Sequence, residues 1–167
     1  MNGPNPYEAL RLRQVADFEA MLPGFVQRFR WSPEQLAAER LRALRALLLL
    51  AIERSPWHRK RLSGVDPGRL TEADVERLPV MTKADLMDHF DEIVTDGRLS
   101  RARCEEHLAA LTGEAYLLDE YHLVASGGSS GRRGVFAFGW DAWVTCYASL
   151  VRPQLWDWTS DPALLGT

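Results

Sequence analysis

The sequence predicts an α/β fold, with a helical segment over residues 1–112 followed by the first strands of an α/β core over residues 113–167. Through most of the first segment, apolar residues recur at helical spacing. After Gly113 the pattern changes to short β-type runs around the glycine-rich stretch Ser126–Gly134. Because only three short strands follow the helices, we expect an incomplete sheet, as in the opening of a larger domain.

Capping and turn residues delimit the first two helices. A helix is expected from Pro6 to Met21, with Pro23-Gly24 ending it. Ser32 can cap a second helix, with Pro33 at its first position and Gln35 completing a capping box. Helical spacing predicts that one apolar stripe of this second helix is buried, consisting of Leu36, Leu41, Leu44, Leu48 and Ile52.

Shorter helices follow. Ser55-Pro56 begins one, and after a turn over Gly64–Gly68 an acidic helix is expected over Thr71–Leu78. Thr82 then caps a helix over Lys83–Val94, with Asp85 as a capping-box-like partner. A further helix is expected over Ser100–Leu111.

The C-terminal part predicts three strands and a helix. The strands are expected over Tyr116–Leu118, Tyr121–Ala125 and Gly134–Phe138. The helix is expected to begin at Trp140-Asp141, to reach about Val151, and to end near Pro153.

Composition limits the classes of function. The formal charge of −3 and the pI of about 5.8 argue against a nucleic-acid partner. Cys104 and Cys146 are typical of reduced thiols, and the four histidines lack metal-ligand spacing, so no metal site is expected. No signal peptide or membrane span is evident, and we expect a soluble cytoplasmic protein without a membrane partner.

The stretch Ser126–Gly134 holds four glycines, three serines and two arginines between apolar runs. Glycine lets backbone N–H groups turn toward a ligand, while serine and arginine side chains add donors that suit phosphate oxygens. Such a loop can hold a polyphosphate. A flexible hairpin loop explains the same composition, since glycine and serine dominate turns. The stretch is not a Walker A motif, because Arg132 and Arg133 follow Gly131.

Three stretches resemble the phenylacetate–CoA ligase-like branch of the adenylate-forming enzymes. Ser55–Leu62 (SPWHRKRL) is similar to the "SPFYRKRL" segment of that branch, and Leu78–Leu86 (LPVMTKADL) to its "LP-x-x-TK-x-DL" segment. Ser126–Arg132 (SGGSSGR) resembles the phosphate loop of the family, commonly written SSGTTGKP. The order and spacing of the three stretches agree with the N-terminal portion of such an enzyme, over essentially the whole chain.

The resemblance implies a nucleotide-binding role for the loop. Serines stand at the two threonine positions, Arg132 at the lysine, and Arg133 departs from the usual proline. Arg132 is the expected catalytic residue, because it would offset charge on the departing phosphates. The residues expected to bind ATP are Ser126, Gly127, Gly128, Ser129, Ser130, Gly131, Arg132 and Arg133.

The family activity implied is a two-step ligation. A carboxylate attacks the α-phosphate of Mg–ATP to give an acyl-adenylate and pyrophosphate, and a thiol, often coenzyme A, then takes the acyl group. The adenine pocket, the magnesium-binding acid and the C-terminal lid of the family have no counterpart in these residues. We therefore expect an N-terminal or truncated part of a ligase that is inactive alone. The carboxylate, the thiol acceptor and the oligomeric state are not defined by the sequence.

Two other interpretations stay open. One is a short, non-catalytic paralogue that uses the loop to hold a nucleotide or a partner. The other is an inactive product whose unpaired sheet edges and exposed apolar surface favour association.

Overall fold

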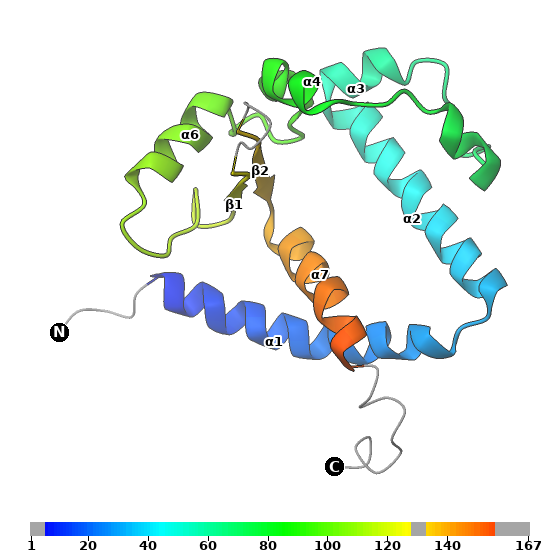
Figure 1. Ribbon diagram of the computed structural model, residues 1–167, viewed down its shortest axis with the longest axis horizontal. Coiled ribbons are helices and arrows are strands. Elements are labelled where there is room, and N and C mark those ends of the chain that lie inside the picture. The colour runs from blue at the N-terminus through cyan, green and yellow to red at the C-terminus, as the bar shows by residue number, and fades with distance from the viewer. Residues whose placement is uncertain (1–5, 128–132, 156–167) are drawn as a thin grey trace, which may run out of the picture. The chain divides into compact units, whose positions relative to one another are not determined.

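In the computed structural model, residues 6–127 and 133–155 are described. They are mostly helical with one small antiparallel sheet, so the mixed class of fold is confirmed at that level (Figure 1). Their contacts divide them into two compact units, described separately here. The first unit contains residues 6–31, 111–124 and 137–155, and the second contains residues 32–110, 125–127 and 133–136. The predicted domain boundary at residue 112 stays a prediction.

In the first unit, α1 (Pro6–Gln27) packs along α7 (Trp140–Val151), which leads into η3 (Arg152–Leu155). Tyr116, Trp140 and Val144 are buried at the centre of this packing. The indole Nε1 of Trp140 donates to Asp17 at 2.6 Å, so a polar contact also joins the two helices. The helix predicted from Trp140 to about Val151 is therefore confirmed.

The expected end of the first helix at Pro23-Gly24 is wrong, because α1 continues through Pro23 to Gln27. Proline inside a helix costs about 3 kcal/mol locally, but tertiary packing overrides such a preference where both flanks are held. Met21 packs against the core of the first unit on one side of Pro23, and Phe25 is buried on the other. The short helix η1 (Arg28–Arg30) follows directly.

The second unit begins with α2 (Pro33–Arg54), whose predicted capping box is confirmed. The hydroxyl of Ser32 accepts from the amide of Gln35 at 3.3 Å, and the Gln35 side chain accepts from the amide of Ser32 at 2.8 Å. Leu48 is buried against Leu62 and Leu70. Three further residues of the predicted stripe are partly buried against the same cluster, namely Leu41, Leu44 and Ile52. The stripe is therefore confirmed for these residues and for Leu48.

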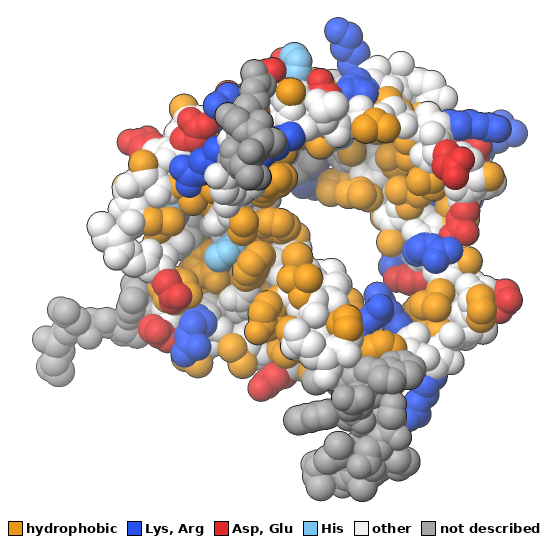
Figure 2. Space-filling view, in the orientation of Figure 1, with side chains coloured by type: hydrophobic (Ala, Val, Ile, Leu, Met, Phe, Trp, Pro, Cys, Tyr) orange, Lys and Arg blue, Asp and Glu red, His pale blue; other side chains and the backbone are white. Residues whose placement is uncertain are grey.

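The prediction that Leu36 is buried is wrong, since 37% of its surface is exposed. Leu36 and Leu41 are five positions apart, and at 3.6 residues per turn this spacing rotates Leu36 about 140° away from Leu41 in the buried stripe. Hydrophobic side chains gather at the surface in Figure 2. Leu47 on α2 and, separately, Leu150 on α7 are exposed hydrophobic residues.

The rest of the second unit consists of short helices. They are α3 (Pro56–Arg61), η2 (Glu72–Arg77), α4 (Lys83–Asp88), α5 (Phe90–Ile93) and α6 (Arg101–Ala110). The acidic helix expected over Thr71–Leu78 is thus a 3₁₀-helix, which is tighter than an α-helix. The helix near residue 101 is confirmed with slightly shorter bounds.

The single helix predicted over Lys83–Val94 is wrong, because His89 interrupts it with φ −117° and ψ 21°. The carbonyl of Met87 in α4 accepts a hydrogen bond from the Arg101 guanidinium at 3.0 Å. The Asp91 carboxylate in α5 accepts from the backbone amide of Arg101 at 2.6 Å. Arg101, which is ten or more positions further along the chain, thus contacts both short helices and stabilises their separate orientations.

The sheet consists of β1 (His122–Ala125) and β2 (Val135–Phe138), which pair as an antiparallel hairpin (Figure 1). The third expected strand, Tyr116–Leu118, is wrong. Leu117 forms only an isolated bridge to Tyr121 across a tight turn in which Leu118 and Asp119 have φ of 57° and 54°. Among the helices of the described residues, none has the length and apolar character needed to cross a membrane.

Candidate functional site

Two hydrogen bonds close the loop that the sequence singles out. The amide of Ser126 donates to the carbonyl of Gly134 at 2.9 Å, and the amide of Gly134 donates to the Ser126 hydroxyl at 2.8 Å. The Ser126 oxygen is therefore an acceptor in the loop closure, while its own hydrogen can still donate to a ligand. Because both bonds join the ends of the stretch, they define a closed loop at the tip of the hairpin.

The predicted site residues are only partly described. Ser126 is half-buried, whereas Gly127 and Arg133 are exposed at the two ends of the loop. Neither a hydrogen bond nor an ion pair joins the Arg133 side chain to another described residue. The remaining predicted residues, Gly128, Ser129, Ser130, Gly131 and Arg132, lie outside the described residues.

Lys83 is a cation at this loop that the sequence analysis did not assign to the site. A Cβ built on Gly134 would lie 3.0 Å from the Lys83 Cε and 3.1 Å from the Phe136 ring, so both side chains press on this glycine. Within the described part of the chain, the Lys83 ammonium has neither an ion pair nor a hydrogen bond. The sequence feature that could have assigned Lys83 to the site is its position in the LPVMTKADL stretch, which resembles a segment of the same enzyme branch.

A capping box fixes the helix that carries Lys83. The Thr82 amide donates to the Asp85 carboxylate at 2.8 Å, and the Asp85 amide donates to the Thr82 hydroxyl at 3.1 Å. The Thr82 amide and the Thr82 hydroxyl both donate to the Asp85 carboxylate, and these two hydrogen bonds lower the pKa of Asp85 because they favour its charged form. The predicted role of Thr82 and Asp85 is therefore confirmed.

Arg61 joins the other two resembling stretches. Its guanidinium donates to the Val80 carbonyl at 2.8 Å and lies 3.9 Å from the Asp85 carboxylate. The same guanidinium stacks over Trp57, 4.3 Å from the ring centroid. Ser55, fully buried, donates from its hydroxyl to the Glu92 carbonyl at 2.9 Å. The segments 55–62 and 78–86 and the ends of the 126–134 loop thus meet within the second unit.

The described ends of the loop carry groups whose chemistry suits an anion. The Ser126 hydroxyl and the Lys83 and Arg133 cations lie around them, and a phosphate oxygen is a suitable acceptor for all three groups. Lysine provides a compact charge, whereas arginine provides a planar fork of donors. Among the described residues, no group of three or more His, Cys, Asp or Glu side chains fits a metal ion. The described residues therefore do not match a protein-held Mg²⁺ site.

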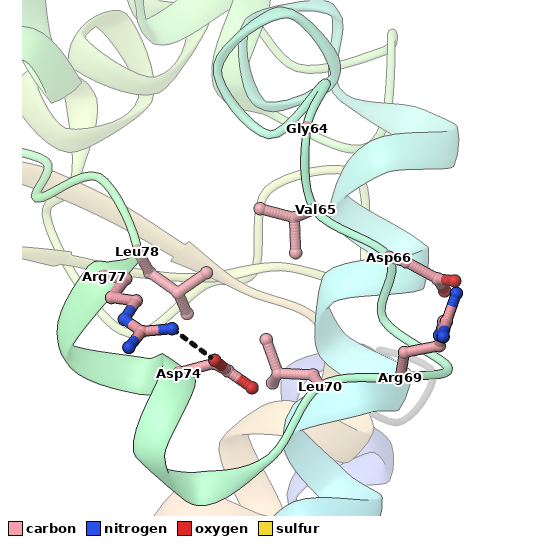
Figure 3. A pocket seen from close by; sticks show the side chains of 8 residues that line it. All are labelled: Gly64, Val65, Asp66, Arg69, Leu70, Asp74, Arg77 and Leu78. Atoms are coloured by element: carbon pink, nitrogen blue, oxygen red, sulfur yellow. Dashed lines mark hydrogen bonds and ion pairs between the residues drawn. The ribbon is translucent and has the colours of Figure 1, made fainter.

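A separate open pocket in the second unit has a volume of about 340 Å³. Figure 3 shows Val65, Leu70 and Leu78 on its walls and the Asp74–Arg77 ion pair, 3.2 Å long, at one side. None of the predicted site residues lines it. Its Asp74 and Arg77 side chains are paired with each other, so the cations at the hairpin are the better candidate site.

Comparison of the chain with protein-family models, curated proteins and solved structures finds no match. The relationship to the adenylate-forming enzymes therefore depends on the three resembling stretches and stays a prediction.

Proposed function

We propose that this chain forms the N-terminal, phosphate-binding part of an ATP-dependent ligase that activates a carboxylate and passes the acyl group to a thiol such as coenzyme A. One observation carries the proposal. Three stretches that resemble the same enzyme branch contact one another within one unit, through Arg61, Lys83 and the hairpin. Arg61 joins the first two stretches across 19 positions, and Lys83 joins the second stretch to the hairpin across 51 positions, as expected if the three stretches belong to one site.

The loop would act on the phosphates of ATP. As a carboxylate oxygen attacks the α-phosphorus, the bond from that phosphorus to the bridging oxygen breaks and pyrophosphate leaves with increased negative charge. Positioned cations and hydroxyl donors stabilise that charge without forming a covalent bond. In this role we place Ser126, Lys83, Arg132 and Arg133, together with backbone N–H groups of the loop.

Lys83 and Arg132 would bring two different kinds of cation to the loop. The loop carries Arg132 where the family has lysine, and arginine does not reproduce the compact charge of an ammonium group. Lys83 brings an ammonium group to the same loop from α4. The pair would therefore offer both kinds of cation to the phosphates. We place the reaction in the cytoplasm, where ATP and coenzyme A are available.

The test is carboxylate-dependent exchange of labelled pyrophosphate into ATP, which reports reversible acyl-adenylate formation. We expect a polypeptide that contains this chain and the later parts of the ligase to catalyse exchange, and Arg132→Ala to abolish it. Robust exchange by the 167-residue chain alone would contradict its role as a part of the enzyme. ATP binding by the longer polypeptide without exchange, over a broad set of carboxylates, would instead support a non-catalytic nucleotide-binding module.

A further inference from the structure

The first residue of β2 has a buried backbone donor without a strand partner. Because the Gly134 carbonyl faces β1, the N–H group of the next residue, Val135, points to the outer edge of the hairpin. Val135 is only 1% exposed, so water cannot readily satisfy this group. The acceptor for this amide is the thioether sulfur of Met87, which lies 3.4 Å from the Val135 nitrogen.

Met87 and Lys83 lie on one face of α4, because residues four apart in a helix are neighbours. Lys83 presses on Gly134, and Met87 accepts from Val135. The helix therefore holds two consecutive residues at the exit of the loop. The Thr82 capping box fixes the start of α4, the helix that carries both side chains.

We propose that Met87 is a positioning residue for the phosphate loop. Its thioether fixes the exit of the loop against α4 and so sets where the Lys83 ammonium stands relative to a bound phosphate. The role in binding rests on the proposed function, whereas the anchoring of Val135 does not. Thioether sulfur is a weak acceptor, but without it the Val135 N–H group would be buried and unpaired.

Met87→Leu isolates this contact, because leucine nearly conserves the volume and removes the acceptor. Met81→Leu is the matched control, since Met81 precedes the same helix and is 39% exposed. Selenomethionine labelling of the otherwise unchanged chain is the conservative rescue, because selenium keeps the acceptor. Two quantities are measured: hydrogen exchange of the Val135 amide in the free chain, and the dissociation constant for MgATP.

We expect Met87→Leu to accelerate exchange at Val135 by about tenfold, the factor that corresponds to a typical net hydrogen bond. The amides of Ser55 and Leu62, which are bonded elsewhere in the same unit, should keep their rates. MgATP should bind several-fold more weakly to Met87→Leu. The Met81→Leu chain and the selenomethionine chain should match the unchanged chain in both measurements.

Unchanged exchange at Val135 in Met87→Leu would overturn the anchoring. Equal acceleration at Val135, Ser55 and Leu62 would also overturn it, because Met87 would then act only through packing. If exchange at Val135 rises selectively and MgATP affinity stays the same, the positioning of Lys83 is overturned. If the unchanged chain binds no MgATP while Val135 responds selectively, the anchoring is supported and the proposed function fails.

Discussion

At the scale of single residues, Gly134 is the described glycine at which an added Cβ would meet the closest neighbours. A Cβ at Gly134 would lie 3.0 Å from the Lys83 Cε and 3.1 Å from Phe136 Cε2, shorter than side-chain contacts normally allow. Both neighbours are side-chain atoms and can move, so the backbone need not change. The expected consequence is displacement of the cation from the loop rather than unfolding.

We therefore expect Gly134→Ala to weaken MgATP binding by about tenfold and to cost about 1 kcal/mol of unfolding free energy, as modest overpacking does. Calorimetric titration and thermal unfolding measure the two effects. Gly97→Ala is the matched control, because a Cβ there meets nothing within 4 Å. Equal MgATP affinity in the Gly134→Ala and Gly97→Ala chains would contradict the placement of Lys83 in the site.

His122 gives a prediction for the first unit. Its ring stacks on Trp143 with centroids 3.8 Å apart. Burial lowers the pKa of His122 from 6.5, and the nearby Glu114 opposes this shift less strongly. The unfolded chain then binds a proton more readily than the folded chain, so stability falls as the pH decreases below about 6.5 and levels off below the folded pKa.

The measurement is the thermal unfolding midpoint between pH 8 and pH 5, compared with His122→Phe. Phenylalanine preserves an aromatic stack and cannot titrate, and the difference between the two chains removes the contribution of all other titrating groups. We expect the midpoint of the unchanged chain to fall further on acidification. Parallel curves for the two chains would show that His122 is not protonated differently on unfolding.

Residue-level prediction from the sequence was strongest for local contacts. Ser32, Gln35, Thr82 and Asp85 were assigned correctly because each capping partner is only three residues away. The approach of Lys83 to Gly134 spans 51 positions and leaves no periodic trace, so sequence reasoning placed Lys83 in a family segment without assigning it to the loop.

At the scale of elements, the capping of α4 links stability to the site. The Thr82 hydroxyl accepts from the Asp85 amide, and loss of such a cap typically costs about 1 kcal/mol. We expect Thr82→Ala to lower the unfolding free energy by about this amount in urea titrations followed by circular dichroism. Thr82→Ser, which keeps the hydroxyl, should stay near the unchanged chain. A loss of the same size in Thr82→Ser would show that the methyl group, rather than the cap, matters.

The elements that the sequence predicted well are those with their own start and stop residues. The first turn of α2, the start of α3 and the whole of α7 belong to this group. The errors occur where distant packing overrides a local pattern. Phe25 beyond Pro23 and Arg101 against Met87 are examples, because neither contact can be inferred from adjacent residues.

At the scale of the whole molecule, the two units present hydrophobic side chains at their surfaces (Figure 2). Leu47 on α2 is 61% exposed, and Leu150 on α7 is 65% exposed. Such surfaces are expected of a chain that packs against further protein, and equally of the inactive product considered from the sequence. Exposed surface alone therefore does not separate these two accounts, whereas nucleotide binding does.

The central claim is that the hairpin loop and α4 together bind the phosphates of ATP. The chain contains only two lysines, and Lys60 on α3 is the natural control for Lys83 because it is exposed within the same unit. Removing a charge-assisted contact typically weakens binding by about tenfold or more.

The most direct measurement is calorimetric titration of MgATP into the unchanged, Lys83→Ala and Lys60→Ala chains at low salt. The account predicts saturable binding by the unchanged chain, the same affinity in Lys60→Ala, and a loss of about tenfold or more in Lys83→Ala. Absence of binding by the unchanged chain, or equal affinities in the two lysine variants, would contradict it.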